Sequence, residues 1–196
     1  MDYPLEDLEQ FVRLLHEVER VRRVARRPDE KQMTSTADHS FELAMVCWYI
    51  ASTHKLDVEY AKVLKYALAH DLVEAYAGDT PNHDQEARKT KAGREAEALR
   101  RLEEEFGEFP DLLETIHEYE LRETPEAKLV YAADKLIDPL TAGMETTQSI
   151  WKDFDMSWES FIGYKSDKVA QSEPVLSYWK QLVGKLEAKK EFFFGK

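Results

Sequence analysis

Apolar side chains recur every three or four residues through the first part of the chain, which is the spacing of amphipathic helices. The helices predicted here span residues 5–27, 38–55 and 57–78. Pro28 ends the first of them, because the residue before a proline is disfavoured in the helical conformation. The polar run over residues 29–37 is expected to be a loop.

The helical pattern continues to the end of the chain. Predicted helices span residues 84–106, 110–122 and 125–147, with one or two more from about residue 154. Pro139 falls inside one of these segments and is expected to kink or break it. We find no repeat, no flexible linker and no alternating stretch long enough to demand a sheet. The pattern therefore predicts one all-α domain over residues 1–196, a helical bundle of roughly six to eight helices whose C-terminal helices (154–190) pack on the rest.

Composition narrows the class of protein. The 196 residues are 43% hydrophobic and 34% charged, which suits a globular domain. No uncharged apolar run reaches the ~18–20 residues of a membrane span, and the N-terminus lacks a secretory signal, so we expect no membrane association. The single cysteine, Cys47, excludes an intramolecular disulfide and suggests a cytoplasmic protein.

The net charge of −12 constrains the partners. It argues against binding to a nucleic acid polymer, because neutralising many phosphates requires a basic face. A small anionic substrate can still bind where the positive charge is local. The chemistry should therefore lie at a metal ion or at a cluster of arginines.

Four ionisable residues interrupt the apolar helices: His39, the adjacent His70 and Asp71, and Asp134. A buried, ionised aspartate is costly without a partner, and a divalent metal would supply one. Two imidazoles and two carboxylates suit one divalent transition metal such as Mn, Co, Fe, Ni or Zn. Because the residues lie on three predicted helices, the hypothesis requires those helices to converge.

This combination resembles the HD superfamily of metal-dependent phosphohydrolases, whose signature is H…HD…D. The matching segments are TADHSFELA with His39, LAHDLVEAYAGD with His70-Asp71, and YAADKL with Asp134. A branch that includes bacterial 5'-deoxynucleotidases and similar eukaryotic HD-domain proteins shows HD-x-x-E-x-x-x-G-D followed by proline, and residues 70–81 read HDLVEAYAGDTP. The likeness covers about residues 8–145 and implies an all-α fold of the HD-domain type.

The resemblance implies roles for two more acids. Glu74 lies four residues after His70, so on a continuous helix the two share a face. By resemblance, Glu74 is the base or water-orienting group, and Asp79 is a candidate acid or substrate-orienting group. Lys135 could contact a phosphate, and Asp138 is a possible rival metal ligand.

The basic run before Pro28 would supply the phosphate-binding arginine, since in the resembling branch a helix-end arginine reaches the phosphate. Arg20 is the first choice and Arg23 the second. The bacterial deoxynucleotidases carry Arg-Trp where this chain has Arg20-Val21, and the loop before His39 is longer here. Selectivity between deoxyribose and ribose therefore stays open.

The leading hypothesis is a phosphomonoesterase that converts nucleoside 5'-monophosphates, including deoxy forms, to nucleoside and phosphate. An alternative is a di-iron oxygenase of the HD type, with His83 and His117 as additional ligands. Another is a non-catalytic HD protein that binds a nucleotide or a partner. The resemblance also implies a homodimer.

Overall fold

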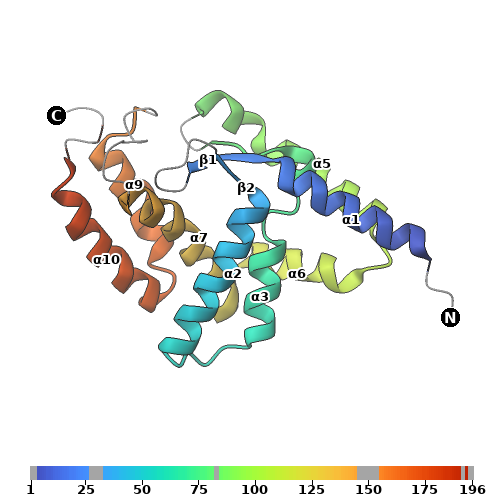
Figure 1. The fold of residues 1–196 in the computed structure, drawn as a ribbon, viewed down its shortest axis with the longest axis horizontal. Helices are drawn as coiled ribbons and strands as arrows, with labels where there is room; N and C mark the ends of the chain where they lie inside the picture. The colour runs from blue at the N-terminus through green and yellow to red at the C-terminus, as the bar shows by residue number, and fades with distance from the viewer. Residues whose placement is uncertain (1–3, 27–32, 82–83, 145–154, 191–192, 194–196) are drawn as a thin grey trace.

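In the computed structural model, residues 4–26, 33–81, 84–144, 155–190 and 193 are described, and helices dominate them (Figure 1). The helices are α1 (Leu5–Arg20), α2 (Thr36–Thr53), α3 (Tyr60–Ala69), α4 (Glu74–Ala77), α5 (Gln85–Glu105), α6 (Pro110–Leu121), α7 (Pro125–Met144), α9 (Trp158–Val169) and α10 (Glu173–Glu187). Two short antiparallel strands, β1 (Arg22–Arg26) and β2 (Met33–Ser35), form a small sheet. The all-α prediction is confirmed. No helix in the described segments is both long enough and apolar enough to span a membrane.

The larger hydrophobic core surrounds α7. This helix buries most of its length against α2 and α3 on one side and against α9 and α10 on the other. Aromatic side chains of the C-terminal helices complete the core, with the Phe161 and Trp179 rings 5.4 Å apart. The C-terminal helices thus share a core with the helices that carry the candidate metal ligands.

A smaller core joins α1 to α5 and α6. Leu14 and Val18 of α1 pack near Phe106, which follows α5. Ala69 and Leu72 contribute from the end of α3 and the turn after it. The segment that contains His70 and Asp71 is therefore held by packing on both sides.

The first predicted helix is wrong beyond Arg20. Instead of continuing to residue 27, the chain leaves the helix at Val21 and forms β1. The pairing with β2 is fixed at Arg22 opposite Ser35, and Thr36 donates from its backbone N–H to the Val21 carbonyl at 3.0 Å. The apolar spacing in the sequence did not distinguish β1 from a continuation of α1. A strand is defined by its pairing partner, and the partner of β1 is separated from it in the sequence. That partner, β2, occupies part of the predicted loop, while residues 27–32 lie outside the described part.

The third predicted helix is also interrupted. It ends at Ala69, and the turn that follows is held by hydrogen bonds three residues apart, such as Glu74 N–H to the Asp71 carbonyl at 3.0 Å. After α4, Gly78 ends the segment with φ +71°, a conformation that favours glycine. In contrast, α7 continues through Pro139, so the predicted break there is wrong.

Candidate metal centre

His70 is held in one orientation at the end of α3. Its Nδ1 donates a hydrogen bond to the Ala67 carbonyl at 2.9 Å, which leaves Nε2 as the atom available for a ligand. Nε2 is buried and has no hydrogen-bond partner among the described residues, although Asp71 Oδ2 lies 2.9 Å away. Burial lowers the pKa of His70, but the carboxylates of Asp71 and Asp134 together raise it above its ordinary value. The pair therefore forms a compact donor set of one nitrogen and one carboxylate.

His39 and Asp134 meet from two other helices. His39 of α2 and Asp134 of α7 are both buried, and His39 Nε2 lies 3.1 Å from Asp134 Oδ1. Asp138, one turn further along α7, places Oδ1 3.9 Å from His39 Nδ1. Asp134 and Asp138 thus bracket the imidazole of His39.

The pair His70–Asp71 and the pair His39–Asp134 lie next to each other. One ligand atom from each of His39, His70 and Asp71 lies within 4.8 Å of the others, and Asp134 adjoins this group through His39. The two imidazole rings are 5.4 Å apart. The unpartnered Nε2 of His70 and the mixture of nitrogen and carboxylate donors fit a divalent transition metal. The three helices converge as the hypothesis required.

Glu74 and Asp79 lie beside this cluster. Glu74 is buried and accepts a hydrogen bond of 2.8 Å from the Thr36 hydroxyl. Burial, and then the charges of Asp71 and Asp79, raise the pKa of Glu74 to about 8. Burial also raises the pKa of Asp79. Thr36 is placed at the start of α2, where Ser35 and Asp38 form a reciprocal capping box.

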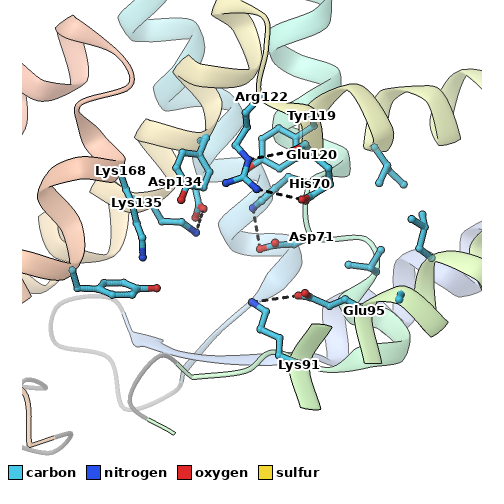
Figure 2. Close-up of a pocket in the computed structure, with 16 residues that line it drawn as sticks. His70, Asp71, Lys91, Glu95, Tyr119, Glu120, Arg122, Asp134, Lys135 and Lys168 are labelled. Carbon is cyan, nitrogen blue, oxygen red and sulfur yellow. Dashed lines mark hydrogen bonds and ion pairs between the residues drawn. The ribbon is translucent and has the colours of Figure 1, made fainter. Parts of the chain in front are cut away.

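A cavity of about 400 Å³ opens at the metal cluster (Figure 2). His70, Asp71 and Asp134 contribute to its wall. Its other charged and aromatic lining residues come from α5, the end of α6, α7 and α9: Lys91, Glu95, Tyr119, Glu120, Arg122, Tyr131, Lys135, Tyr164 and Lys168. The cavity therefore places the candidate metal ligands beside several cationic side chains and tyrosines.

Comparison with known proteins decides the family. A model of the HD domain family matches residues 18–176. The chain belongs to the HD domain family. The resemblance seen in the motifs is therefore confirmed.

This HD domain is also similar to a solved structure and to curated relatives. The crystal structure of a predicted metal-dependent phosphohydrolase from Magnetospirillum magnetotacticum MS-1 matches with a TM-score of 0.82 and 25% identity, over 97% of this chain and 98% of that one. The 5'-deoxynucleotidase HDDC2 of Danio rerio is 31% identical over 137 residues, 67% of this chain and 66% of that protein. The Bos taurus HDDC2 is 31% identical over 134 residues, 66% of this chain and 63% of that protein. The match thus spans somewhat less than two thirds of the length of these relatives.

In this HD domain the two arginines predicted to bind phosphate have different surroundings. Arg20 is 71% exposed in its side chain and pairs with Glu17, away from the cluster. The side chain of Arg23, on β1, is only 11% exposed and donates to Asp71 at 3.0 Å and to Asp138 at 3.3 Å. Arg20, the first choice for phosphate binding, therefore lies on the surface, whereas Arg23, the second choice, lies at the candidate metal site.

Other predicted residues fall outside the cluster. His117 is exposed on α6 and contributes no ligand here, while His83 lies outside the described residues. The di-iron alternative gains no support from them. Asp138 contacts Arg23 and faces His39 from the side of Nδ1, which suits a residue that positions a ligand.

Sequence reasoning missed most of the cavity wall. Tyr131 lies one turn before Asp134 on α7, so helical spacing could have found it. Lys91, Arg122 and Lys168 come from three separate elements. No local pattern in the sequence connects them to the motif.

Proposed function

We propose that this chain is a metal-dependent phosphomonoesterase that hydrolyses nucleoside 5'-monophosphates, deoxy forms included, to nucleoside and phosphate. The observation that carries the proposal is the buried His–Asp cluster on the wall of a cavity with four cationic side chains. The names of the HDDC2 relatives, 5'-deoxynucleotidases, supply the substrate class.

His39, His70, Asp71 and Asp134 would hold the metal. When bound, a divalent ion lowers the pKa of water that it coordinates and neutralises charge that develops on the phosphoryl group. The hydrogen bond from His70 Nδ1 to Ala67 keeps Nε2 directed at the cluster. Mn, Co, Fe, Ni and Zn all suit this donor set.

The remaining residues position the reactants and move protons. Glu74 is held by the Thr36 hydroxyl, and its raised pKa makes the ionised carboxylate a stronger base, which suits a group that accepts a proton from the attacking water. Arg23 holds Asp71 and Asp138 in place and brings a guanidinium to the site, where it can stabilise phosphate charge. Asp79, whose pKa burial raises, would return a proton to the leaving 5'-oxygen.

The test is a phosphate-release assay on protein loaded with Mn or Co, with a panel of deoxy- and ribonucleoside monophosphates. We expect release of inorganic phosphate, and loss of release in Asp71→Ala. Elemental analysis of the same samples shows whether metal is bound. Bound metal without release from any nucleotide would refute the proposed activity and leave a non-catalytic binding protein.

We also propose that the protein is a cytoplasmic homodimer that does not act on nucleic acid polymers. Large apolar side chains are exposed at helical spacing along α1 and α2: Leu5, Leu8, Val12, Leu15, Phe41, Met45, Trp48 and Tyr49. Burial of such a surface in a self-contact would remove it from water. Size-exclusion chromatography with light scattering tests the dimer, and a monomeric mass would reject it.

A further inference from the structure

Three lysines gather where α9 packs against α7, next to the metal cluster. Lys135 pairs with Asp134. On α9, Lys168 Nζ lies 3.0 Å from the centre of the Tyr164 ring, and Lys165 Nζ lies 5.8 Å from the same ring. Figure 2 shows Lys135 and Lys168 close together on the side of the cavity where Asp134 lies. Like charges are therefore concentrated on one wall.

Two of these lysines have no carboxylate partner within the described segments of the chain. Lys165 is 8% exposed, yet neither it nor Lys168 makes a hydrogen bond or an ion pair with any residue that the structure describes. Burial, and then repulsion from Lys135 and Lys165, lower the pKa of Lys168 to about 7. Burial likewise lowers the pKa of Lys165 to about 8. A group of like charges, one of them buried and two half-buried, is costly, and a bound anion would offset that cost.

The other cations of the cavity are already paired. Lys91 lies 3.3 Å from Glu95, and Arg122 lies 3.6 Å from Glu120. Lys168 is thus the cavity cation that the described carboxylates leave unpaired. In a protein with a net charge of −12, an unpaired lysine at the substrate cavity needs a specific reason.

We propose that Lys168 and Lys135 form a phosphate-binding subsite on the α7–α9 wall of the cavity, with Lys165 behind them adding positive potential. Lysine binds phosphate as a mobile point charge, which suits two side chains that converge from different helices. The phosphate has two possible sources, the reacting group of a nucleoside monophosphate or a second phosphate on the same substrate. The identity of that substrate rests on the proposed function, whereas the subsite itself does not.

The test compares Lys168→Met, Lys168→Arg and the control Lys180→Met, whose lysine is exposed on α10. Binding of inorganic phosphate to Mn-loaded protein is measured by calorimetry. KM is measured for deoxyadenosine 5'-monophosphate and for deoxyadenosine 3',5'-bisphosphate. We expect Lys168→Met to weaken binding roughly 10-fold, Lys168→Arg to retain most of it and Lys180→Met to match the unaltered protein.

The pattern of losses identifies the source of the phosphate. Weaker binding of inorganic phosphate together with a higher KM for the monophosphate assigns Lys168 to the reacting phosphate. A higher KM for the bisphosphate alone assigns it to a second phosphate. Unchanged values for all three ligands, in a variant with an unchanged melting temperature, would overturn the subsite.

The same measurements also distinguish the phosphate subsite from the proposed nucleotidase activity. Binding of phosphate that depends on Lys168, in a protein that hydrolyses no nucleotide, would retain the subsite and reject the nucleotidase. Hydrolysis of nucleotides, with phosphate binding and both KM values unchanged in Lys168→Met, would retain the nucleotidase and reject the subsite. Lys168→Gln replaces the Met variant if that variant fails to fold.

Discussion

Arg20 and Arg23 are three residues apart, yet Arg20 faces solvent and Arg23 contacts Asp71 of the candidate metal site. We expect Arg23→Met to lower kcat/KM by roughly 100-fold or more, because a buried charge that positions Asp71 and stabilises phosphate is lost. Arg20→Met is the matched control and should stay within about 2-fold, since an exposed pair with Glu17 contributes little. Steady-state kinetics on a nucleotide substrate checks both, and equal losses in the two variants would contradict the placement.

The sequence could not choose between these arginines. A basic run that continues a helical pattern offers several candidates, and helical spacing favours none of them. The choice is made by β1, whose pairing with β2 exposes Arg22 and directs Arg23 inward. The candidate metal ligands are a different case, because histidines and aspartates within apolar helices stand out in the sequence itself.

Glu74 gives the protein a pH dependence with a definite sign. The fold raises the pKa of its carboxyl group from the ordinary 4.5 to about 8. Between these values the folded chain holds a proton that the unfolded chain releases, so stability falls as pH rises through this window. In metal-free protein, Glu74→Gln removes that loss and should be more stable than the unaltered protein by on the order of 2 kcal/mol at about pH 9.

Urea unfolding of chelator-treated protein at several pH values tests this expectation. The two stability curves should lie close together near pH 5 and separate as the pH rises. Glu19→Gln is the control, because Glu19 is exposed on α1 and its curve should follow the unaltered protein. A Glu74→Gln curve that runs parallel to the unaltered one across the range would reject the raised pKa.

At the scale of elements, the turn after α3 is a feature that the apolar pattern of the sequence does not predict. A continuous helix over residues 57–78 explains why Glu74 was expected on the face of His70. The structure brings Glu74 to the site by another route, through a tight turn that restarts as α4 and ends at Gly78. Spacing predicted that Glu74 lies near His70, but the turn depends on packing of Ala69 and Leu72 against α1 and α6, which no local pattern contains.

Two helical glycines test the packing of α10 on α7. A Cβ on Gly143 would lie 3.1 Å from Leu182 Cδ1 and 3.3 Å from Leu186 Cδ2, whereas a Cβ on Gly184 meets nothing within 4 Å. Gly143→Leu should therefore lower the free energy of unfolding by about 1–3 kcal/mol through overpacking. Gly184→Leu, the matched control, should raise it by about 0.5–1 kcal/mol through helix propensity. Denaturant unfolding measures both, and a stabilising Gly143→Leu would show that α10 does not pack closely there.

At the scale of the whole molecule, the candidate site joins the two cores. His39 and Asp134 belong to helices of the larger core, while His70 and Asp71 sit at the junction with the smaller one. The cluster also concentrates three carboxylates, those of Asp71, Asp134 and Asp138, with Arg23 and Lys135 as their counter-charges. A metal held there would connect α2, α3 and α7 through the imidazole and carboxylate side chains that these elements contribute.

Metal removal should therefore be visible in global stability. A metal present at 100 times its dissociation constant stabilises the fold by about 2.7 kcal/mol. For a chain of this size, that corresponds to a fall in melting temperature of roughly 5–10 °C when a chelator is added. Differential scanning calorimetry with and without Mn, and after Mn is restored, measures the shift. Asp71→Asn is the control, since a chain that has lost a ligand should respond weakly to the chelator, and an equal response in both proteins would place the stabilising metal somewhere other than this cluster.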